Sequence, residues 1–218
     1  METRPHTHGL PGKFIAVEGG EGVGKSVQVK LLKESLPRRY PHHEIIFVHE
    51  PGGTPFADLI RGIIIQGMRE TDARTLFALF LASRFDHTKK VIIPALTRGA
   101  AVVSDRYEGS TFAYQVFAQR AEDLHALFYS HQQLVPVPDL TLVLEVPSDV
   151  VLARVAKRKG QKATAFDLEA REFHDRLVEG FRWYAKFNSK QQIKFVDGNR
   201  PEDQVHDDFL RHIAAVLS

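Results

Sequence analysis

The stretch that most constrains this chain runs from Phe14 to Val27 and reads "FIAVEGGEGVGKSV". An apolar, strand-like run leads into a loop that satisfies G-x-x-x-x-G-K-[ST], and a predicted helix follows. Small residues let backbone N–H groups turn inward around phosphate oxygens, and the helix N-terminus adds a favourable dipole. We expect Lys25 to bridge the β- and γ-phosphates of a nucleoside triphosphate and Ser26 to ligate Mg²⁺. The residues expected to contact ATP and its phosphates are Gly19, Gly20, Glu21, Gly22, Val23, Gly24, Lys25, Ser26 and Val27.

Composition narrows the class of protein. The chain has 218 residues, of which 43% are hydrophobic and 26% charged, and its formal net charge is +2. These values are typical of a globular domain and favour neither a nucleic-acid nor a membrane partner. No apolar run approaches the ~20 residues of a membrane helix, and the absence of cysteine excludes disulfides and thiolate metal sites. We expect one cytoplasmic domain over residues 13–218 after a flexible leader over residues 1–12.

Apolar runs alternate with helix-like stretches along the chain. Continuous Val/Ile-rich strands separated by helices indicate an α/β fold with a parallel sheet covered on both faces. The strands are expected at 14–17, 45–48, 101–103, 140–146 and 193–196. The helices are expected at 25–36, 56–65, 71–96, 107–134 and 148–157, with a polar surface excursion over 157–165. Ligands should bind at the carboxyl edge of such a sheet.

Two helices carry side chains suited to a nucleotide. In "TLFALFLASRFDH", Phe80 and Arg84 are four residues apart and therefore share one helix face. A ring beside a guanidinium can stack on a nucleobase and hydrogen-bond its edge, although an aromatic residue at helical spacing is more often core. Arg61 lies on the helix expected after "HEPGGTP", where a solvated surface arginine is the alternative.

The strand in "GAAVVSDRYEGS" ends at Asp105 and Arg106. A carboxylate just past a second strand end can hold Mg²⁺ through water beside the phosphate loop. Arg106 could then neutralise charge on a transferring phosphoryl group, with a structural Asp–Arg pair as the alternative. Lys25, Asp105 and Arg106 are therefore the candidate catalytic residues of the core.

Together these segments resemble the thymidylate kinase family over about residues 13–181. The resemblance is carried, in order, by "EGGEGVGKS", "EPGGTPFADLIR", "LFLASRFDH…VIIPALTRG", "VVSDRYEGSTFAYQ" and "PDLTLVLEVP". It implies a P-loop, three-layer fold with a five-stranded parallel sheet, flanking helices and a short lid at about residues 157–168. It also implies a homodimer that transfers the γ-phosphoryl group of MgATP to dTMP, giving dTDP and ADP in dTTP synthesis.

The resemblance assigns four residues to the thymine base. By the family's motifs, Phe80 would stack on the ring and Arg84 would hydrogen-bond its edge. Two more positions, Thr111 and Gln115, would contact the ring from the other side.

The remaining acceptor roles concern the phosphate and the sugar. Arg61 and Arg106 would hold the acceptor phosphate, and Glu21 would bind the sugar 3′-hydroxyl. The resemblance makes Glu50 a pocket-side carboxylate and Asp105 the carboxylate beside the metal and phosphates. The acceptor is already a phosphate dianion, so the reaction needs alignment and charge neutralisation rather than a strong base.

The chain departs from the family's bacterial pattern at three places. Val27 stands where a hydroxyl usually contacts the α-phosphate of the donor, and His49 replaces an arginine. In the lid, "TAFDLEA" has Ala165 at the place of an arginine, shortly before the Asp matched by Asp167. The other subclass carries its arginine in the phosphate loop, where this chain has Gly22.

Another cation should therefore replace the missing arginine, because an arginine finger contributes about 10³–10⁵ in rate. The candidates are Arg154, Arg158, Lys159 and Lys162, unless this basic run is merely solvated. Arg158 is favoured, since a planar fork matches phosphate oxygens better than an ammonium.

Two alternatives to a thymidylate kinase stay open. One is a kinase of the same fold with another nucleotide or nucleoside acceptor. The other is a nucleotide-binding regulator with impaired turnover, which Val27 and Ala165 would explain.

Overall fold

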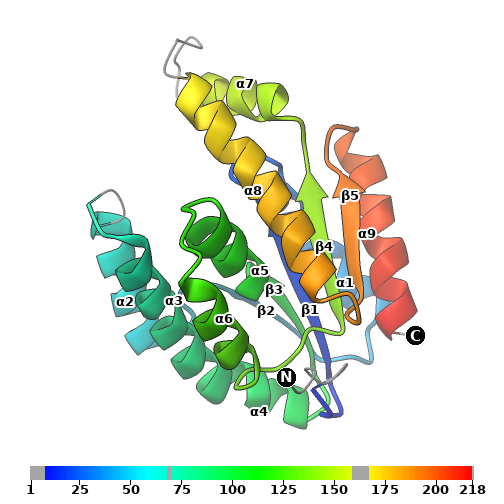
Figure 1. The fold of residues 1–218 in the computed structure, drawn as a ribbon. Helices are drawn as coiled ribbons and strands as arrows, with labels where there is room; N and C mark the ends of the chain where they lie inside the picture. The colour runs from blue at the N-terminus through cyan, green and yellow to red at the C-terminus, as the bar shows by residue number, and fades with distance from the viewer. Residues whose placement is uncertain (1–7, 68–69, 159–166, 218) are drawn as a thin grey trace.

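A five-stranded, all-parallel sheet forms the centre of the chain (Figure 1). The computed structural model describes residues 8–67, 70–158 and 167–217, without the side chains of 158 and 167–170. The strands lie in the order β2-β3-β1-β4-β5, so β1 and the phosphate loop that follows it are central. Their bounds are β1 Lys13–Gly19, β2 Ile45–His49, β3 Ala101–Asp105, β4 Leu140–Glu145 and β5 Ile193–Asp197. The predicted α/β class and parallel sheet are confirmed.

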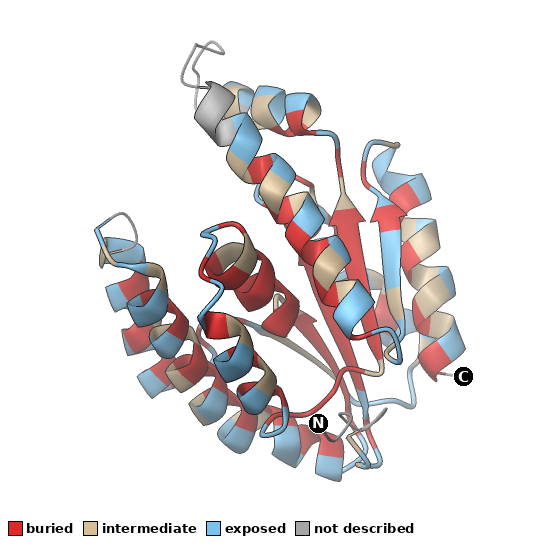
Figure 2. Ribbon diagram, viewed as in Figure 1, coloured by how far each residue is buried: buried red, intermediate tan, exposed pale blue. Residues whose placement is uncertain are grey.

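Helices cover both faces of the sheet because its central strands are apolar on both sides. Ile15 and Val17 of β1 pack with α1 (Lys25–Arg39) and α9 (Glu202–Leu217). Phe14 and Ala16 face the other way, toward α4 (Ile93–Thr97). On that second face β4 also packs against α8 (Asp167–Phe187). Figure 2 shows the resulting layers, with buried residues on the central strands and on the inner sides of the helices.

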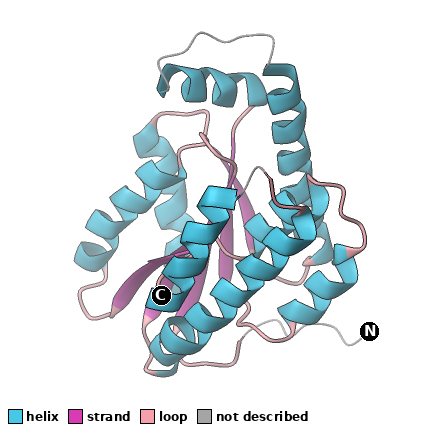
Figure 3. Cartoon of the chain, turned by 90° about the vertical axis from the view of Figure 1, so that its left-hand side faces the viewer, coloured by secondary structure: helices cyan, strands magenta, loops and turns pink. Residues whose placement is uncertain are grey.

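Two features position the site beside the sheet. Helices α2 (Pro55–Gly67) and α3 (Ala73–His87) form a pair that packs through Ile60, Ile64 and Leu76. Thr54 caps α2, since its Oγ1 accepts the backbone N–H of Ala57 at 3.0 Å. Helix α7 (Ser148–Arg158) follows β4 and lies beyond the carboxyl end of the sheet (Figures 1 and 3).

The helix predictions need three corrections. The stretch expected as one helix at 71–96 is helical from 73 to 97, but a π-helical turn η1 (Thr88–Ile92) lies between α3 and α4, just before Pro94, which has no N–H to continue the regular ladder. The helix at 107–134 is divided into α5 (Glu108–Thr111), η2 (Phe112–Phe117) and α6 (Leu124–Gln132). That break follows from Arg120, whose φ of 55° is incompatible with a right-handed helix. Helices α8 and α9 were not predicted at all.

Contacts with the rest of the fold begin before the expected start of the domain at residue 13. Residues 8–12, expected to belong to a flexible leader, are held in place: His8 Nε2 lies 3.0 Å from Asp139 Oδ2, and Gly12 N–H donates to Leu96 O at 2.8 Å. Most of the expected lid, including Lys159, Lys162 and Ala165, lies outside the described residues. Within the described ranges, none of the helices has the length and apolar character required to cross a membrane.

Candidate active site

The phosphate loop turns tightly at its glycines. Gly19 has φ 139°, and a Cβ at this position would come within 2.7 Å of Leu144 O. Gly24, the N-cap of α1, has φ 104°, in the left-handed region that side chains disfavour. The loop therefore wraps the N-terminus of α1, where unpaired N–H groups favour an anion.

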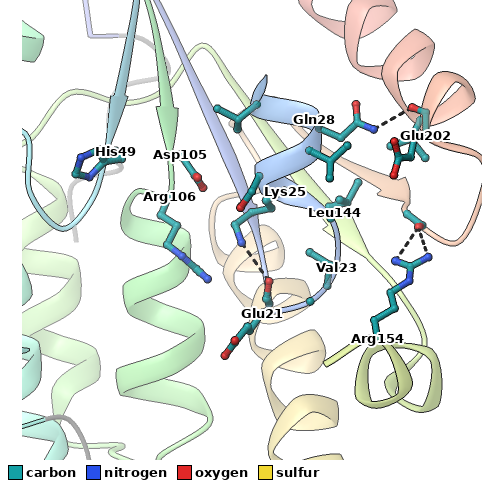
Figure 4. Close-up of a pocket in the computed structure, with 18 of the residues that line it drawn as sticks. Glu21, Val23, Lys25, Gln28, His49, Asp105, Arg106, Leu144, Arg154 and Glu202 are labelled. Atoms are coloured by element: carbon teal, nitrogen blue, oxygen red, sulfur yellow. Dashed lines mark hydrogen bonds between the residues drawn. The ribbon is translucent and has the colours of Figure 1, made fainter. Parts of the chain in front are cut away.

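Lys25 points from the start of α1 toward the loop, and its Nζ donates to Gly20 O at 3.1 Å (Figure 4). Its side chain is buried, and burial together with the charge of Arg106 lowers the pKa of Lys25 to about 8. Asp105, Glu18 and Glu21 oppose this shift. The surroundings therefore disfavour the charged form of Lys25, and additional negative charge bound in the loop would stabilise it.

A cavity of about 800 Å³ lies at the carboxyl edge of the sheet. It brings together residues predicted from separate motifs: Gly20, Glu21, Gly22, Val23, Gly24, Lys25, Ser26, Val27, Glu50, Arg61, Asp105 and Arg106. Gly19 lies behind this lining, and its carbonyl accepts a bond from Arg106 at 3.1 Å. Lys25, Arg61 and Arg106 meet the N-terminus of α1 here, which makes this cavity a candidate site for phosphates.

Arg106 is fixed from several sides. Its NH1 donates to Gly19 O and, at 2.9 Å, to Ser110 Oγ, while its guanidinium lies 5.2 Å from the ring centre of Tyr114. Its φ of 71° is unusual for a residue with a side chain. Arg61, on α2, donates from NH1 to Pro51 O at 2.8 Å. Both guanidiniums are therefore held at the wall of the cavity.

Behind the cavity lies a fully buried polar group centred on Arg84. Its Nε donates to Glu50 Oε2 at 2.7 Å, its NH2 donates to Thr111 Oγ1 at 2.9 Å, and its NH1 lies 3.4 Å from His131 Nε2. Burial works to lower the pKa of Arg84, but the charge and hydrogen bond of Glu50, together with the neighbouring Tyr107 and Glu108, outweigh it, and the net shift of the pKa is upward. His131, and His87 on the other Glu50 oxygen, were not predicted.

The structure places the other predicted base residues outside the cavity lining. Phe80 is half-buried and packs with the cluster that joins α2 to α3, and Gln115 is buried in η2. The spacing that joined Phe80 to Arg84 is therefore correct for the helix, but the two side chains have different neighbours.

On the far wall of the cavity, the sequence analysis named only Arg154, as a candidate cation, and missed the residues that follow β5. This wall includes Arg154 of α7, whose NH1 and NH2 both donate to Gly198 O at 3.3 Å, and Glu202 (Figure 4). Arg200 also lines it. The loop after β5 could have been found by the rule that loops at the carboxyl ends of parallel strands meet at one edge. Arg158 ends α7, and its side chain lies outside the described part of the structure.

The donor set of the cavity fits a hard cation that shares its coordination with phosphates. Asp105 Oδ1 is buried and has no hydrogen-bond partner, and Ser26 is exposed in the same cavity. Among the described residues, no three His, Asp or Glu side chains are grouped to hold a metal by themselves. Mg²⁺ commonly binds through one or two protein groups plus substrate phosphates, so these residues fit it.

The comparisons with known proteins agree with this geometry. The profile of the thymidylate kinase family matches residues 17–209. A thymidylate kinase of Gluconobacter oxydans is 41% identical over 195 residues, covering 88% of this chain and 89% of the relative. One of Rhodopseudomonas palustris is 37% identical over 218 residues, covering 95% and 90%. The crystal structure of thymidylate kinase from Ehrlichia chaffeensis superposes with a TM-score of 0.74 at 27% identity, covering 94% of this chain and 99% of that one. The chain belongs to the thymidylate kinase family, with the corresponding nucleoside monophosphate kinase activity.

Proposed function

We propose that the γ-phosphoryl group of MgATP is transferred to dTMP in the cavity at the carboxyl edge of the sheet, and that the residues lining this cavity catalyse the transfer. ATP is the donor that the family uses. The observation that carries the assignment is the convergence of Lys25, Arg61 and Arg106 on one cavity beside the α1 N-terminus. In this proposal an oxygen of the dTMP phosphate attacks the γ-phosphorus, and the bond from that phosphorus to the β-phosphate oxygen breaks to release ADP.

On the donor side, Lys25 and the backbone N–H groups of the loop hold the β- and γ-phosphates. Val27 is 37% exposed and lines the cavity, which supports the expectation that the α-phosphate loses one hydroxyl contact. Ser26 and Asp105 are the residues proposed to hold Mg²⁺, which when bound would neutralise phosphate charge. The unpartnered Oδ1 of Asp105 supports this assignment.

On the acceptor side, Arg61 and Arg106 hold the dTMP phosphate. Because both guanidiniums are anchored by backbone carbonyls, they lose little freedom when the phosphate binds. Glu21 remains the proposed partner of the sugar 3′-hydroxyl, and its place in the cavity supports this.

Thymine recognition is proposed for Phe80, Arg84, Thr111 and Gln115. A guanidinium has five N–H donors, and the contacts of Arg84 with Glu50, Thr111 and His131 engage three of its nitrogens once each. One N–H on each terminal nitrogen is therefore left for a base edge. The rigid network would fix the direction of these donors.

Arg158 is the proposed lid cation. It ends α7 four residues after Arg154, which lines the cavity, so the two positions share one face of the helix. This supports the view that the basic run after α7 serves the donor phosphates in place of an arginine at Ala165.

A homodimer and a cytoplasmic location complete the proposal. Support for the dimer comes from α2, where Phe56, Leu59 and Ile63 are 52%, 69% and 56% exposed. These residues form one apolar stripe on the helix, of the kind that a partner subunit usually covers.

A coupled ADP-release assay with MgATP tests the reaction, run with dTMP, dUMP, dCMP, dGMP and no acceptor. We expect dTMP to give turnover well above the others. Faster turnover with another monophosphate would support the alternative of a kinase of the same fold with a different acceptor. Tight ATP binding without transfer to any acceptor would support the impaired regulator.

A further inference from the structure

Glu18 is a fully buried carboxylate at the end of β1 to which none of the roles above assigns a function. It is 0% exposed and directly precedes Gly19 of the phosphate loop. Its Oε1 accepts the backbone N–H groups of Tyr107 at 2.9 Å and Ser110 at 3.1 Å, and its Oε2 accepts the Ser110 hydroxyl at 2.5 Å. The carboxylate thus holds the first turn of α5, immediately after Arg106.

The Ser110 hydroxyl connects this carboxylate to Arg106. Since the hydroxyl donates its proton to Glu18, its lone pairs are left to accept the NH1 group of Arg106 at 2.9 Å. The same NH1 donates to Gly19 O, the residue next to Glu18. Two consecutive residues of β1, one directly and one through Ser110, therefore hold the guanidinium from one side, while the Tyr114 ring lies against it.

The backbone around Arg106 is built to fit the carboxylate. Arg106 has φ 71°, in the left-handed region, and directly after it the N–H groups of Tyr107 and Ser110 both donate to one oxygen of Glu18. Gly109 lies against the same oxygen, and a Cβ at this position would come within 2.9 Å of Glu18 Oε1. The turn can lie this close to β1 only because residue 109 is glycine.

We propose that Glu18 is a positioning residue, which aims the Arg106 guanidinium at the acceptor phosphate through the Ser110 hydroxyl. The inference rests on the proposed role of Arg106 in phosphoryl transfer. Glu18 also directly precedes the phosphate loop. It therefore connects Arg106, which is proposed to hold the acceptor phosphate, with the loop that is proposed to hold the donor phosphates. Loss of this link would leave the guanidinium in several orientations and lower kcat more than substrate affinity.

The test is a double-mutant cycle between Glu18 and Arg106. Glu18→Gln keeps the size of the side chain but removes its charge and replaces one of its two acceptor oxygens with an NH2 group, so the side chain cannot accept from the two backbone N–H groups on one side and from the Ser110 hydroxyl on the other. We expect kcat to fall at least about tenfold in the wild-type background, and less than about twofold when Arg106→Ala is already present. The KM for ATP should stay within about twofold of the wild-type value in Glu18→Gln.

Glu108→Gln is the matched control, because Glu108 is also 0% exposed and accepts a side-chain hydrogen bond, from the Tyr184 hydroxyl at 2.7 Å. It should change kcat by the same factor in both backgrounds. Equal factors for Glu18→Gln in both backgrounds would overturn the positioning role, since a residue that only stabilises the fold gives that pattern.

Two further results separate this inference from the proposal on which it rests. If Arg106→Ala alone leaves kcat unchanged, the role of Arg106 is wrong and the role of Glu18 falls with it. If Glu18→Gln does not fold, Ser110→Ala in the same two backgrounds replaces it, because it removes the link and keeps the carboxylate. A loss of kcat that disappears in the Arg106→Ala background supports the inference, and one that persists overturns it.

Discussion

At the scale of single residues, the charge of Lys25 should depend on pH within the range in which the enzyme can be assayed. Its pKa of about 8 in the free protein means that the ammonium begins to lose its proton just above neutral pH. Bound phosphates stabilise the charged form and raise its pKa, so the affinity for ATP must fall as the pH rises through about 8. We expect kcat/KM for ATP to drop by up to about tenfold per pH unit above this value, while kcat stays level to higher pH.

Initial rates at fixed free Mg²⁺ between about pH 7 and pH 9.5 measure this effect. Lys25→Arg is the control, because a guanidinium stays protonated throughout this range. Its kcat/KM, although lower, should not fall in the same way. A flat wild-type profile up to pH 9.5 would mean that the site does not depress the pKa of Lys25.

A second prediction at this scale concerns the buried pair of Arg84 and Glu50. Arg84→Ala should raise KM for dTMP more than KM for ATP, because it removes donors proposed to face the base. It should also destabilise the fold by about 3–5 kcal/mol, since Glu50 would be left buried without its guanidinium. Urea unfolding and steady-state kinetics separate these two effects.

The double variant Arg84→Ala with Glu50→Gln distinguishes recognition from stability. It removes the uncompensated charge, so most of the lost stability should return while KM for dTMP stays high. If KM for dTMP recovers together with stability, Arg84 has only a structural role.

At the scale of elements, the five strands could be predicted because each is a short run rich in apolar residues. Only β1, β3 and β4 are buried along most of their length, whereas the edge strands β2 and β5 are partly exposed. The helices were harder. A π-helical turn precedes Pro94 and a left-handed residue, Arg120, interrupts the stretch expected as one helix at 107–134, and the conformation of Arg120 has no signal in the sequence. Helix α8 did have a signal in the sequence, because the apolar residues Phe173, Leu177 and Phe181 recur every four residues.

The same limit applies to the site. The loop and the Asp105–Arg106 segment are contiguous motifs, so their chemistry can be inferred locally. Arg154 and Gly198, however, meet only because α7 and the loop after β5 fold to the same edge. Glu18 looks like an ordinary part of the motif, and only its contacts with Ser110 and Tyr107 distinguish it.

Helix α7 provides the prediction at this scale. If Arg158 supplies the lid cation, Arg158→Ala should lower kcat at least about tenfold and leave the KM for dTMP nearly unchanged. Lys157→Ala is the matched control: it removes a neighbouring positive charge from another face of α7 and should leave kcat within about twofold. Steady-state kinetics of both variants decides. If Arg154→Ala lowers kcat instead, the lid role belongs to Arg154.

At the scale of the whole molecule, α2 connects the proposed dimer to the active site. One side of the helix carries the exposed stripe of Phe56, Leu59 and Ile63, and another side carries Arg61 into the cavity. A partner that covers the stripe would hold α2 against α3 and so fix the position of Arg61. Assembly and acceptor binding should therefore be coupled through this one helix.

Leu59→Glu tests this coupling, because a charge in the middle of an apolar interface costs several kcal/mol unless it is paired. We expect the variant to sediment as a monomer, with a KM for dTMP raised several-fold and a KM for ATP close to that of the wild type. Ile65→Glu is the matched control: Ile65 is 61% exposed on the same helix but points away from the stripe. It should remain dimeric with unchanged kinetics. A wild-type protein that is monomeric at micromolar concentration would contradict the dimer, and a monomeric Leu59→Glu with normal KM for dTMP would show that assembly does not position Arg61.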